Sequence, residues 1–102
     1  MLIFYKDNDN LIRWDGLCRP SDGAYVNDAT VTFVLKDSDN VSMTSGSMPY
    51  VSGTSGRYQG VIDSSVALGS PGDVVWLEAT AISGTLKGFR RIQGRIVYRK
   101  EN

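Results

Sequence analysis

The sequence predicts an all-β domain, either a sandwich or a small barrel. Short runs rich in β-branched and aromatic residues are separated by turn signals at fairly regular intervals, such as Asp15-Gly16, Pro71-Gly72 and Ser83-Gly84. No amphipathic helical stretch of roughly ten or more residues is present. The chain has 102 residues, of which 41% are hydrophobic, and this predicts a single globular domain spanning residues 1–102.

Two segments alternate as half-buried strands do. In residues 30–36, Val31, Phe33 and Leu35 are expected to face the core, and Val34 departs from the pattern. In residues 73–82, Trp76, Glu78 and Thr80 are expected to face away from the core. The core-facing residues predicted for that second strand are Val75, Leu77, Ala79 and Ala81.

The two ends of the chain also predict strands. Residues 2–5 and 11–14 are short strands that the turn at residues 7–10 could join as a hairpin. The last strand is expected over residues 89–99, with Ile92, Ile96 and Tyr98 on one face together with Gly94. We expect residues 1–10 to form an N-terminal arm or an edge strand.

The segment MPYVSGTSGRYQGVID, residues 48–63, reads as a hairpin. Residues 48–52 would run outward and residues 57–63 would return, with Tyr58 and Ile62 facing inward. Gly53-Thr54-Ser55-Gly56 also resembles a nucleic-acid-binding GXXG loop or a phosphate cradle, but both of these need adjacent helices. A tight turn is favoured. The glycines expected to permit the turn and close packing are Gly53, Gly56 and Gly60.

Charge is distributed unevenly, although the formal net charge is zero. Residues 1–85 hold five basic and ten acidic residues, a net of −5, and residues 86–102 hold six basic residues and one acidic residue, a net of +5. This asymmetry fits a surface that docks on an oppositely charged partner or on a copy of the same chain. A solvated, arginine-rich last strand is an equal alternative. Because the net charge is zero, the overall charge gives no reason to expect nucleic-acid binding.

The residue types argue against an enzyme, a cofactor or a metal centre. Histidine is absent, which removes the most common general base and zinc ligand, and Cys18 has no second cysteine. The aspartate-rich turns that begin at Asp7 and Asp37 have Leu11 and Val41 where a calcium-binding EF-hand loop needs a fifth-position oxygen ligand. Carboxylate pairs that form only in the folded chain stay open as a possibility.

The first residues, MLIFYKD, have only a short apolar run before Lys6 and no basic segment ahead of that run, so no signal peptide is expected. No stretch approaches the roughly 20 apolar residues that span a bilayer. We therefore expect synthesis in a reducing cytoplasm and no membrane partner.

Three segments carry a family resemblance: WDGLCRPSDGAYVNDATVTFVLKDSDN, MPYVSGTSGRYQGVID and DVVWLEATAISG. Together they cover roughly residues 11–84 and are similar to small phage and prophage structural proteins with an Ig-like, or transthyretin-like, β-sandwich. The resemblance implies an Ig-like antiparallel sandwich of about seven strands, with a core strand that begins at Asp28-Ala29-Thr30-Val31 and with Tyr58 facing inward. Asn40 stands where the family pattern often has glycine, and asparagine tolerates the same left-handed turn.

The resemblance also implies a non-enzymatic virion component, most simply a capsid decoration or cement protein that binds the major capsid protein or copies of itself. A head–tail connector, which would contact portal or connector proteins, is the alternative within that class. A sandwich whose loops bind a sugar or a cell surface is a further alternative, and its aromatic candidates are Tyr25, Tyr50 and Trp14. The residues expected at an interface are Leu2, Phe4, Tyr5, Trp14, Trp76, Arg90, Arg91, Arg95 and Arg99.

Overall fold

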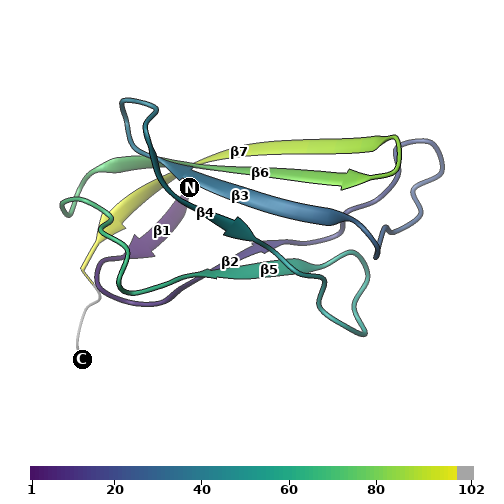
Figure 1. Ribbon diagram of the computed structural model, residues 1–102, viewed down its shortest axis with the longest axis horizontal. Helices are drawn as coiled ribbons and strands as arrows, with labels where there is room; N and C mark the ends of the chain where they lie inside the picture. Colours follow the sequence, from purple (N-terminus) through teal and green to yellow (C-terminus); the bar gives the residue numbers. More distant parts are fainter. Residues whose placement is uncertain (99–102) are drawn as a thin grey trace.

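A computed structural model describes residues 1–98 and contains seven strands and no helix within them (Figure 1). This confirms the all-β prediction, and it leaves no helix in that part of the chain that could cross a membrane. The strands are β1 (Leu2–Tyr5), β2 (Asn10–Trp14), β3 (Thr30–Lys36), β4 (Ser42–Ser47), β5 (Tyr58–Ile62), β6 (Val74–Ser83) and β7 (Leu86–Val97).

The strands form two sheets that pack as a flattened sandwich, with extents of 42 × 32 × 21 Å. The larger sheet has the order β1-β7-β6-β3-β4 and the smaller one pairs β2 with β5 (Figure 1). The order β7-β6-β3-β4 matches the G-F-C-C′ order of a variable-type immunoglobulin sheet when β3 is taken as strand C and β4, which follows it, as strand C′. All pairs are antiparallel except β1 with β7, which is parallel, so the sandwich is not antiparallel throughout.

The predicted hairpin between residues 2–5 and 11–14 is wrong, because β1 and β2 belong to different sheets. Phe4 faces the core from β1 and lies against Gly94 of β7, where an added Cβ would come within 2.5 Å of the phenyl ring. Glycine at that position therefore lets β1 settle on β7. The turn at residues 6–9 then carries the chain across to the smaller sheet.

The core lies between the two sheets and follows the predicted alternation. The predicted inward residues of β3 and β6 are all buried, and Ile12, Tyr58 and Ile62 are buried on the smaller sheet. The buried residues of β3 and β6 are Val31, Phe33, Leu35, Val75, Leu77, Ala79 and Ala81. Ile96 of β7 is buried as predicted, whereas Tyr98 lies beyond the end of β7 and is 61% exposed.

Residues 48–63 form the predicted hairpin over a short stretch, because Tyr50 pairs with Tyr58 in an antiparallel bridge, and the same segment carries the chain from one sheet to the other. β4 ends at Ser47 in the larger sheet and β5 begins at Tyr58 in the smaller one. The backbone is nevertheless drawn together, because the N–H of Val51 donates to the carbonyl of Arg57 at 2.9 Å. The turn itself is as predicted: Gly53 and Gly56 both have positive φ, at 82° and 69°.

Tyr58 and Ile62 face inward as predicted, at 0% and 1% exposure. The Tyr58 hydroxyl donates to the carbonyl of Val26 at 2.6 Å and accepts from the N–H of Ala29 at 3.1 Å. This buried phenol therefore fixes the long β2–β3 loop to the smaller sheet. Gly60 permits close packing, because a Cβ there would lie 2.8 Å from the carbonyl oxygen of Ser47.

Candidate interaction surface

Two of the residues expected at an interface are in the core, and that prediction is wrong for them. Phe4 is 2% exposed and Trp14 is 8% exposed. Both rings lie against a glycine of β7, Phe4 at Gly94 and Trp14 at Gly88, where an added Cβ would be 3.2 Å from the indole. The missing side chains on β7 make room for the two aromatic rings between the sheets, and a sequence pattern cannot reveal this pairing.

The first residues form an edge strand, which is one of the two predicted alternatives, and they do not form an arm. β1 pairs in parallel with β7 from Leu2–Gly94 to Tyr5–Val97. Leu2 packs against the core and Tyr5 is partly buried. Both residues contribute more to the attachment of β1 than to an accessible surface.

Asn10 closes the outer edge of β1 at Tyr5. Its side-chain oxygen accepts from the N–H of Tyr5 at 2.8 Å, and its amide nitrogen donates to the carbonyl of Tyr5 at 2.9 Å. Asn10 is 5% exposed and is the polar residue most deeply buried among residues 1–98. A side-chain amide thus replaces, at this residue, the strand that would otherwise pair with the edge.

β7 is covered differently along its length. It pairs with β6 without a register shift from Leu86 to Arg95, but on its other side β1 reaches only Gly94–Val97. No other strand within residues 1–98 pairs there. We call the uncovered segment, Leu86–Gln93, the open edge of β7.

The hydrogen-bond pattern shows which backbone groups of the open edge are unpaired. The N–H and carbonyl of Ile96 bond to the segment that leads into β6, whereas the carbonyl of Val97 accepts from the N–H of Lys6 on the β1 side. Because neighbouring residues of a strand point their backbone groups to opposite edges, odd-numbered residues face the β1 side throughout. On the open edge these residues are Lys87, Phe89, Arg91 and Gln93.

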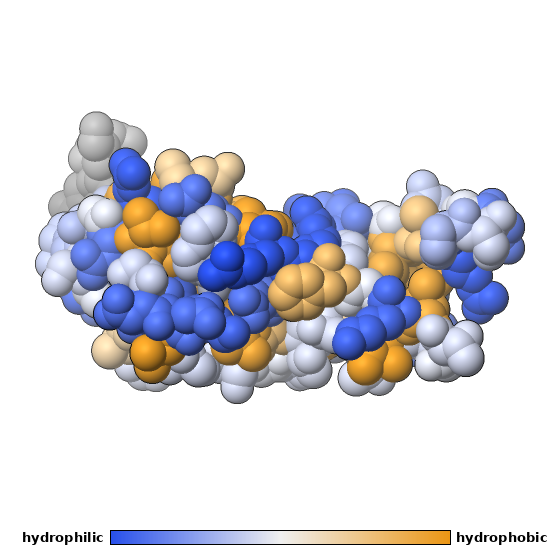
Figure 2. All heavy atoms as spheres, turned by 90° about the horizontal axis from the view of Figure 1, so that it is seen from above, coloured by the Kyte–Doolittle hydropathy of each residue, from blue (hydrophilic) through white to orange (hydrophobic). Residues whose placement is uncertain are grey.

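Five of the eight residues of the open edge are exposed, and three of these five are cationic. Lys87, Arg90 and Arg91 are all exposed, and Phe89 among them is 57% exposed. Figure 2 views the molecule from above, from the β7 side of Figure 1, and shows hydrophilic and hydrophobic side chains interleaved along this face. The predicted interface residues Arg90 and Arg91 lie on this edge, Arg95 is exposed further along β7, and Arg99 is outside the described residues.

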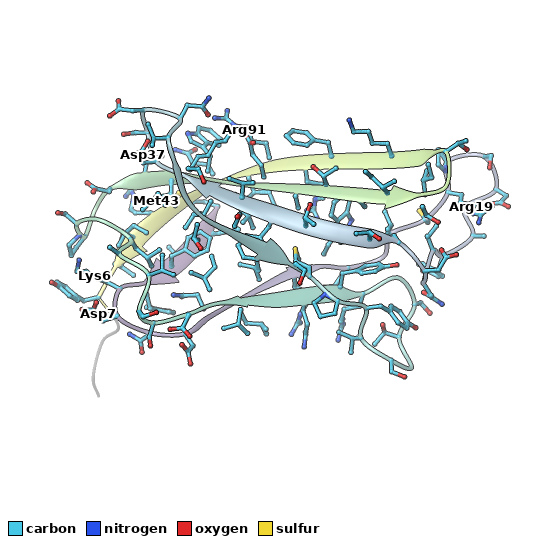
Figure 3. The ribbon with its side chains drawn as sticks, in the orientation of Figure 1. Lys6, Asp7, Arg19, Asp37, Met43 and Arg91 are labelled. Atoms are coloured by element: carbon cyan, nitrogen blue, oxygen red, sulfur yellow. The ribbon has the colours of Figure 1, made fainter. Side chains whose placement is uncertain are left out.

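Two of the cations are held over aromatic rings. The Arg91 guanidinium lies 4.1 Å from the centre of the Trp76 ring, and that of Arg90 lies 5.4 Å from the centre of the Trp14 ring. Trp76 is partly buried beneath Arg91, on the outer face of the larger sheet where the sequence predicted it. Figure 3 shows Arg91 near the β3–β4 loop, and its Nη2 lies 3.5 Å from Oδ1 of Asn40.

Glu78 links Arg91 to Lys36 across three strands. Its carboxylate is 2.9 Å from the Lys36 ammonium and 3.0 Å from Nε of Arg91, and its side chain is 17% exposed. The hydrogen bond from Lys36 lowers the pKa of Glu78, partial desolvation opposes this, and Arg91 adds a smaller lowering. Glu78 therefore stays ionised and fixes Arg91, which leaves Lys87 and Arg90 without a carboxylate partner among the described side chains.

A concavity of about 350 Å³ lies beside the open edge, between β7 and the start of the β2–β3 loop. Trp14, Leu17, Leu86 and Gly88 line its apolar part. It is the space that a longer β1 would have covered. The sequence did not identify Lys87 or Phe89 as interface residues, although the alternation of β7 places Phe89 on the same outward face as Arg91.

The aspartate-rich turns lie at the end of the sandwich opposite the concavity, where Figure 3 labels Asp7 and Asp37. Asp37 accepts from the N–H groups of Asp39 and Val41, at 2.9 and 3.0 Å, so it stabilises its own turn. Asp63 also accepts a hydrogen bond within its own turn, from the backbone N–H of Ser65, and this bond lowers the pKa of Asp63. Within residues 1–98 no group of three acidic or cysteine side chains is close enough to hold a metal ion.

The aromatic candidates for sugar binding do not gather in one place. Tyr25 is 59% exposed, Trp14 is in the core, and Tyr50 is partly buried with its hydroxyl donating to the carbonyl of Thr54. The open edge of β7 is therefore the best-formed candidate surface. Comparison of the chain with protein-family models, with curated proteins and with solved structures finds no match.

Proposed function

We propose that this chain is a non-enzymatic structural protein of a bacteriophage virion, which decorates and stabilises the major capsid shell. The sequence resemblance to small phage sandwich proteins supports the virion context. The observation that carries an adhesive role is the open edge of β7, a cationic strand edge beside an apolar concavity. A surface of this kind binds other protein chains through backbone, charge and a small apolar contact together.

A head–tail connector has the same adhesive chemistry and differs in copy number. Quantitative mass spectrometry of purified, salt-washed particles separates the two roles. A decoration protein is expected at a level comparable with the major capsid protein. A level corresponding to a single ring per particle would replace decoration with the connector role. Absence from washed particles would overturn the virion proposal.

Binding to bare capsids provides a second test. Purified protein mixed with capsids that lack it should add regular density to the shell in electron micrographs, and the coated shells should resist heating better than bare ones. Raised salt should remove the added density, because the contact is partly between exposed charges. Bare shells of unchanged appearance and heat resistance would contradict decoration.

A further inference from the structure

The open edge of β7 has the geometry of a strand-addition site. The backbone groups of Lys87, Phe89 and Arg91 and the N–H of Gln93 point away from β6, and no strand within residues 1–98 pairs with them. A row of unpaired N–H and carbonyl groups on an extended strand is a template for another strand. We propose that this edge binds an extended, acidic segment of a partner protein by adding it to the larger sheet.

Charge selects the chemistry of that segment. Leu86–Gln93 contains Lys87, Arg90 and Arg91 and no acidic residue. Glu78 is ion-paired with Arg91, but Lys87 and Arg90 are not close to any described carboxylate. An incoming strand with glutamate or aspartate opposite these positions would supply the missing anions, and cross-strand pairs of opposite charge stabilise a sheet.

A second copy of the same edge is a poor occupant. Two β7 edges paired about a two-fold axis would bring together two sets of Lys87, Arg90 and Arg91. Like charges directly opposite one another destabilise a strand pair. The same cations that protect the edge against self-pairing thus favour a partner of opposite charge.

The two faces of the added strand would meet different surroundings. A residue opposite Gly88 would point inward over the apolar concavity lined by Trp14 and Leu17. A residue opposite Phe89 would point outward beside an exposed phenyl ring. The segment that fits best therefore has two apolar residues in its centre, flanked on both sides by acidic residues.

This inference deepens the proposed function, and it rests on that function only for the identity of the partner as a capsid protein. Strand addition at the open edge depends on geometry and charge within this chain. Its test is therefore made with a peptide and without particles. Failure of the peptide test leaves the particle copy number unaffected, and absence from particles leaves the peptide result unaffected.

The probe is a fluorescently labelled peptide with the sequence Thr-Glu-Glu-Val-Val-Glu-Glu-Thr. Its palindromic order allows it to pair with β7 in either direction. We expect saturable binding that weakens as salt is raised, with amide chemical-shift changes concentrated at Lys87, Phe89, Arg91 and Gln93. The control peptide, Thr-Lys-Lys-Val-Val-Lys-Lys-Thr, has the same backbone and the opposite charge, and it should not bind.

A pair of variants separates strand addition from simple charge attraction. Phe89→Ala removes the ring and keeps the backbone N–H that points to the open edge, whereas Phe89→Pro removes both. Proline is tolerated on a strand edge where its missing N–H faces solvent, so the ladder to β6 should survive. We expect Phe89→Pro to bind the acidic peptide about tenfold more weakly than Phe89→Ala, the cost of roughly one backbone hydrogen bond.

Circular dichroism of both variants checks that they fold. If Phe89→Pro does not fold, amide hydrogen exchange of the unaltered protein decides the question, because the acidic peptide should slow exchange at the four edge amides. Equal affinity of the two folded variants, binding of the lysine peptide, or no binding of the acidic peptide would overturn the proposal. Edge amides that exchange equally fast with and without saturating peptide would overturn it as well.

Discussion

The outer edge of β1 and the open edge of β7 lie in the same sheet but are finished in opposite ways. At Tyr5 the buried amide of Asn10 bonds to both backbone groups, so the edge is closed by a neutral side chain of the same chain. Along Leu86–Gln93 the backbone groups have no such cover and are flanked by cations. If neither edge had a binding role, side chains of the same chain could have closed both. We therefore assign binding to the open edge of β7.

The largest effect is expected where β1 is anchored. Phe4→Ala removes a 2%-exposed ring from between the sheets and should lower the free energy of unfolding by about 3–5 kcal/mol. It should also release β1 and extend the open edge to Val97. Urea denaturation measures the loss of stability, and hydrogen exchange at Arg95 and Val97 reports the release.

Ile3→Ala is the matched control for Phe4→Ala. Ile3 is the neighbouring residue on β1 and is 46% exposed on the opposite face. Its truncation should change the free energy of unfolding by no more than about 0.5–1 kcal/mol. Equal losses for the two variants would mean that β1 is not held by the Phe4 ring.

The second largest effect is expected at the outer edge of β1, which Asn10 closes. Asn10→Ala deletes the hydrogen bonds from Asn10 to the N–H and the carbonyl of Tyr5, and the carbonyl keeps only the longer bond from the N–H of Asn8, at 3.3 Å, among those the structure describes. We expect a loss of about 2–3 kcal/mol in urea denaturation. Leu11→Ala, at an exposed position on the same strand, serves as the control and should be nearly neutral. An Asn10→Ala protein as stable as its parent would show that water replaces the amide at no cost.

Gly88 and Gly94 both face the core from β7, and alanine substitutions at these positions compare how tightly its two halves are packed. A Cβ at Gly94 would be 2.5 Å from the Phe4 ring, whereas a Cβ at Gly88 would be 3.2 Å from Trp14. Gly94→Ala should therefore destabilise by about 1–3 kcal/mol, and Gly88→Ala by clearly less, because Trp14 lies beside the concavity and can shift. Thermal unfolding of both variants gives the order, and the reverse order would be inconsistent with a tightly packed β1 and a loosely covered open edge.

The smallest effect concerns Glu78, which holds Arg91 on the open-edge side. Its pKa is lowered in the folded chain, mainly by the hydrogen bond from Lys36, so its contribution to stability is complete above the unfolded pKa of about 4.3 and is lost as the pH falls through the folded pKa. Glu78→Gln should therefore cost less than about 1 kcal/mol at pH 7 and nothing in strong acid.

Carbon-detected NMR titration of the Glu78 carboxyl group tests the cause of the shift. Lys36→Gln should raise the pKa of Glu78 more than Arg91→Gln does, because Lys36 makes the larger contribution. A larger rise in Arg91→Gln would reverse this assignment. Urea denaturation of Glu78→Gln and its parent at a series of pH values gives the corresponding energies.

Much of the fold could be predicted from the sequence because it depends on local pattern. The alternation in residues 30–36 and 73–82 identified the buried residues of β3 and β6, and positive-φ glycines marked the turn after residue 52. The pairing of the ends could not be predicted in this way. The position of β1 depends on Phe4 meeting Gly94, residues ninety positions apart along the chain, and period-two patterning carries no information on such contacts.

The candidate site was predicted only in part for the same reason. The excess of basic residues after residue 85 pointed to β7, and Arg90, Arg91 and Arg95 are exposed there. The aromatic residues were harder to assign, because Trp14 and Phe89 look equally apolar in the sequence. Trp14 is covered because Gly88 leaves space for it, and Phe89 is exposed because the alternation of β7 places it on the outward face of the sheet with Arg91.

Amide hydrogen exchange along β7, measured by NMR on the free protein, tests the difference between the two halves most directly. The open edge predicts rapid exchange at Lys87, Phe89, Arg91 and Gln93, and slow exchange at Gly88, Arg90 and Ile92, which bond to β6. From Gly94 onward, where β1 covers the strand, slow exchange should extend to Arg95 and Val97. Uniformly slow exchange from Leu86 to Val97 would show that the edge is already covered, and it would contradict a binding site there.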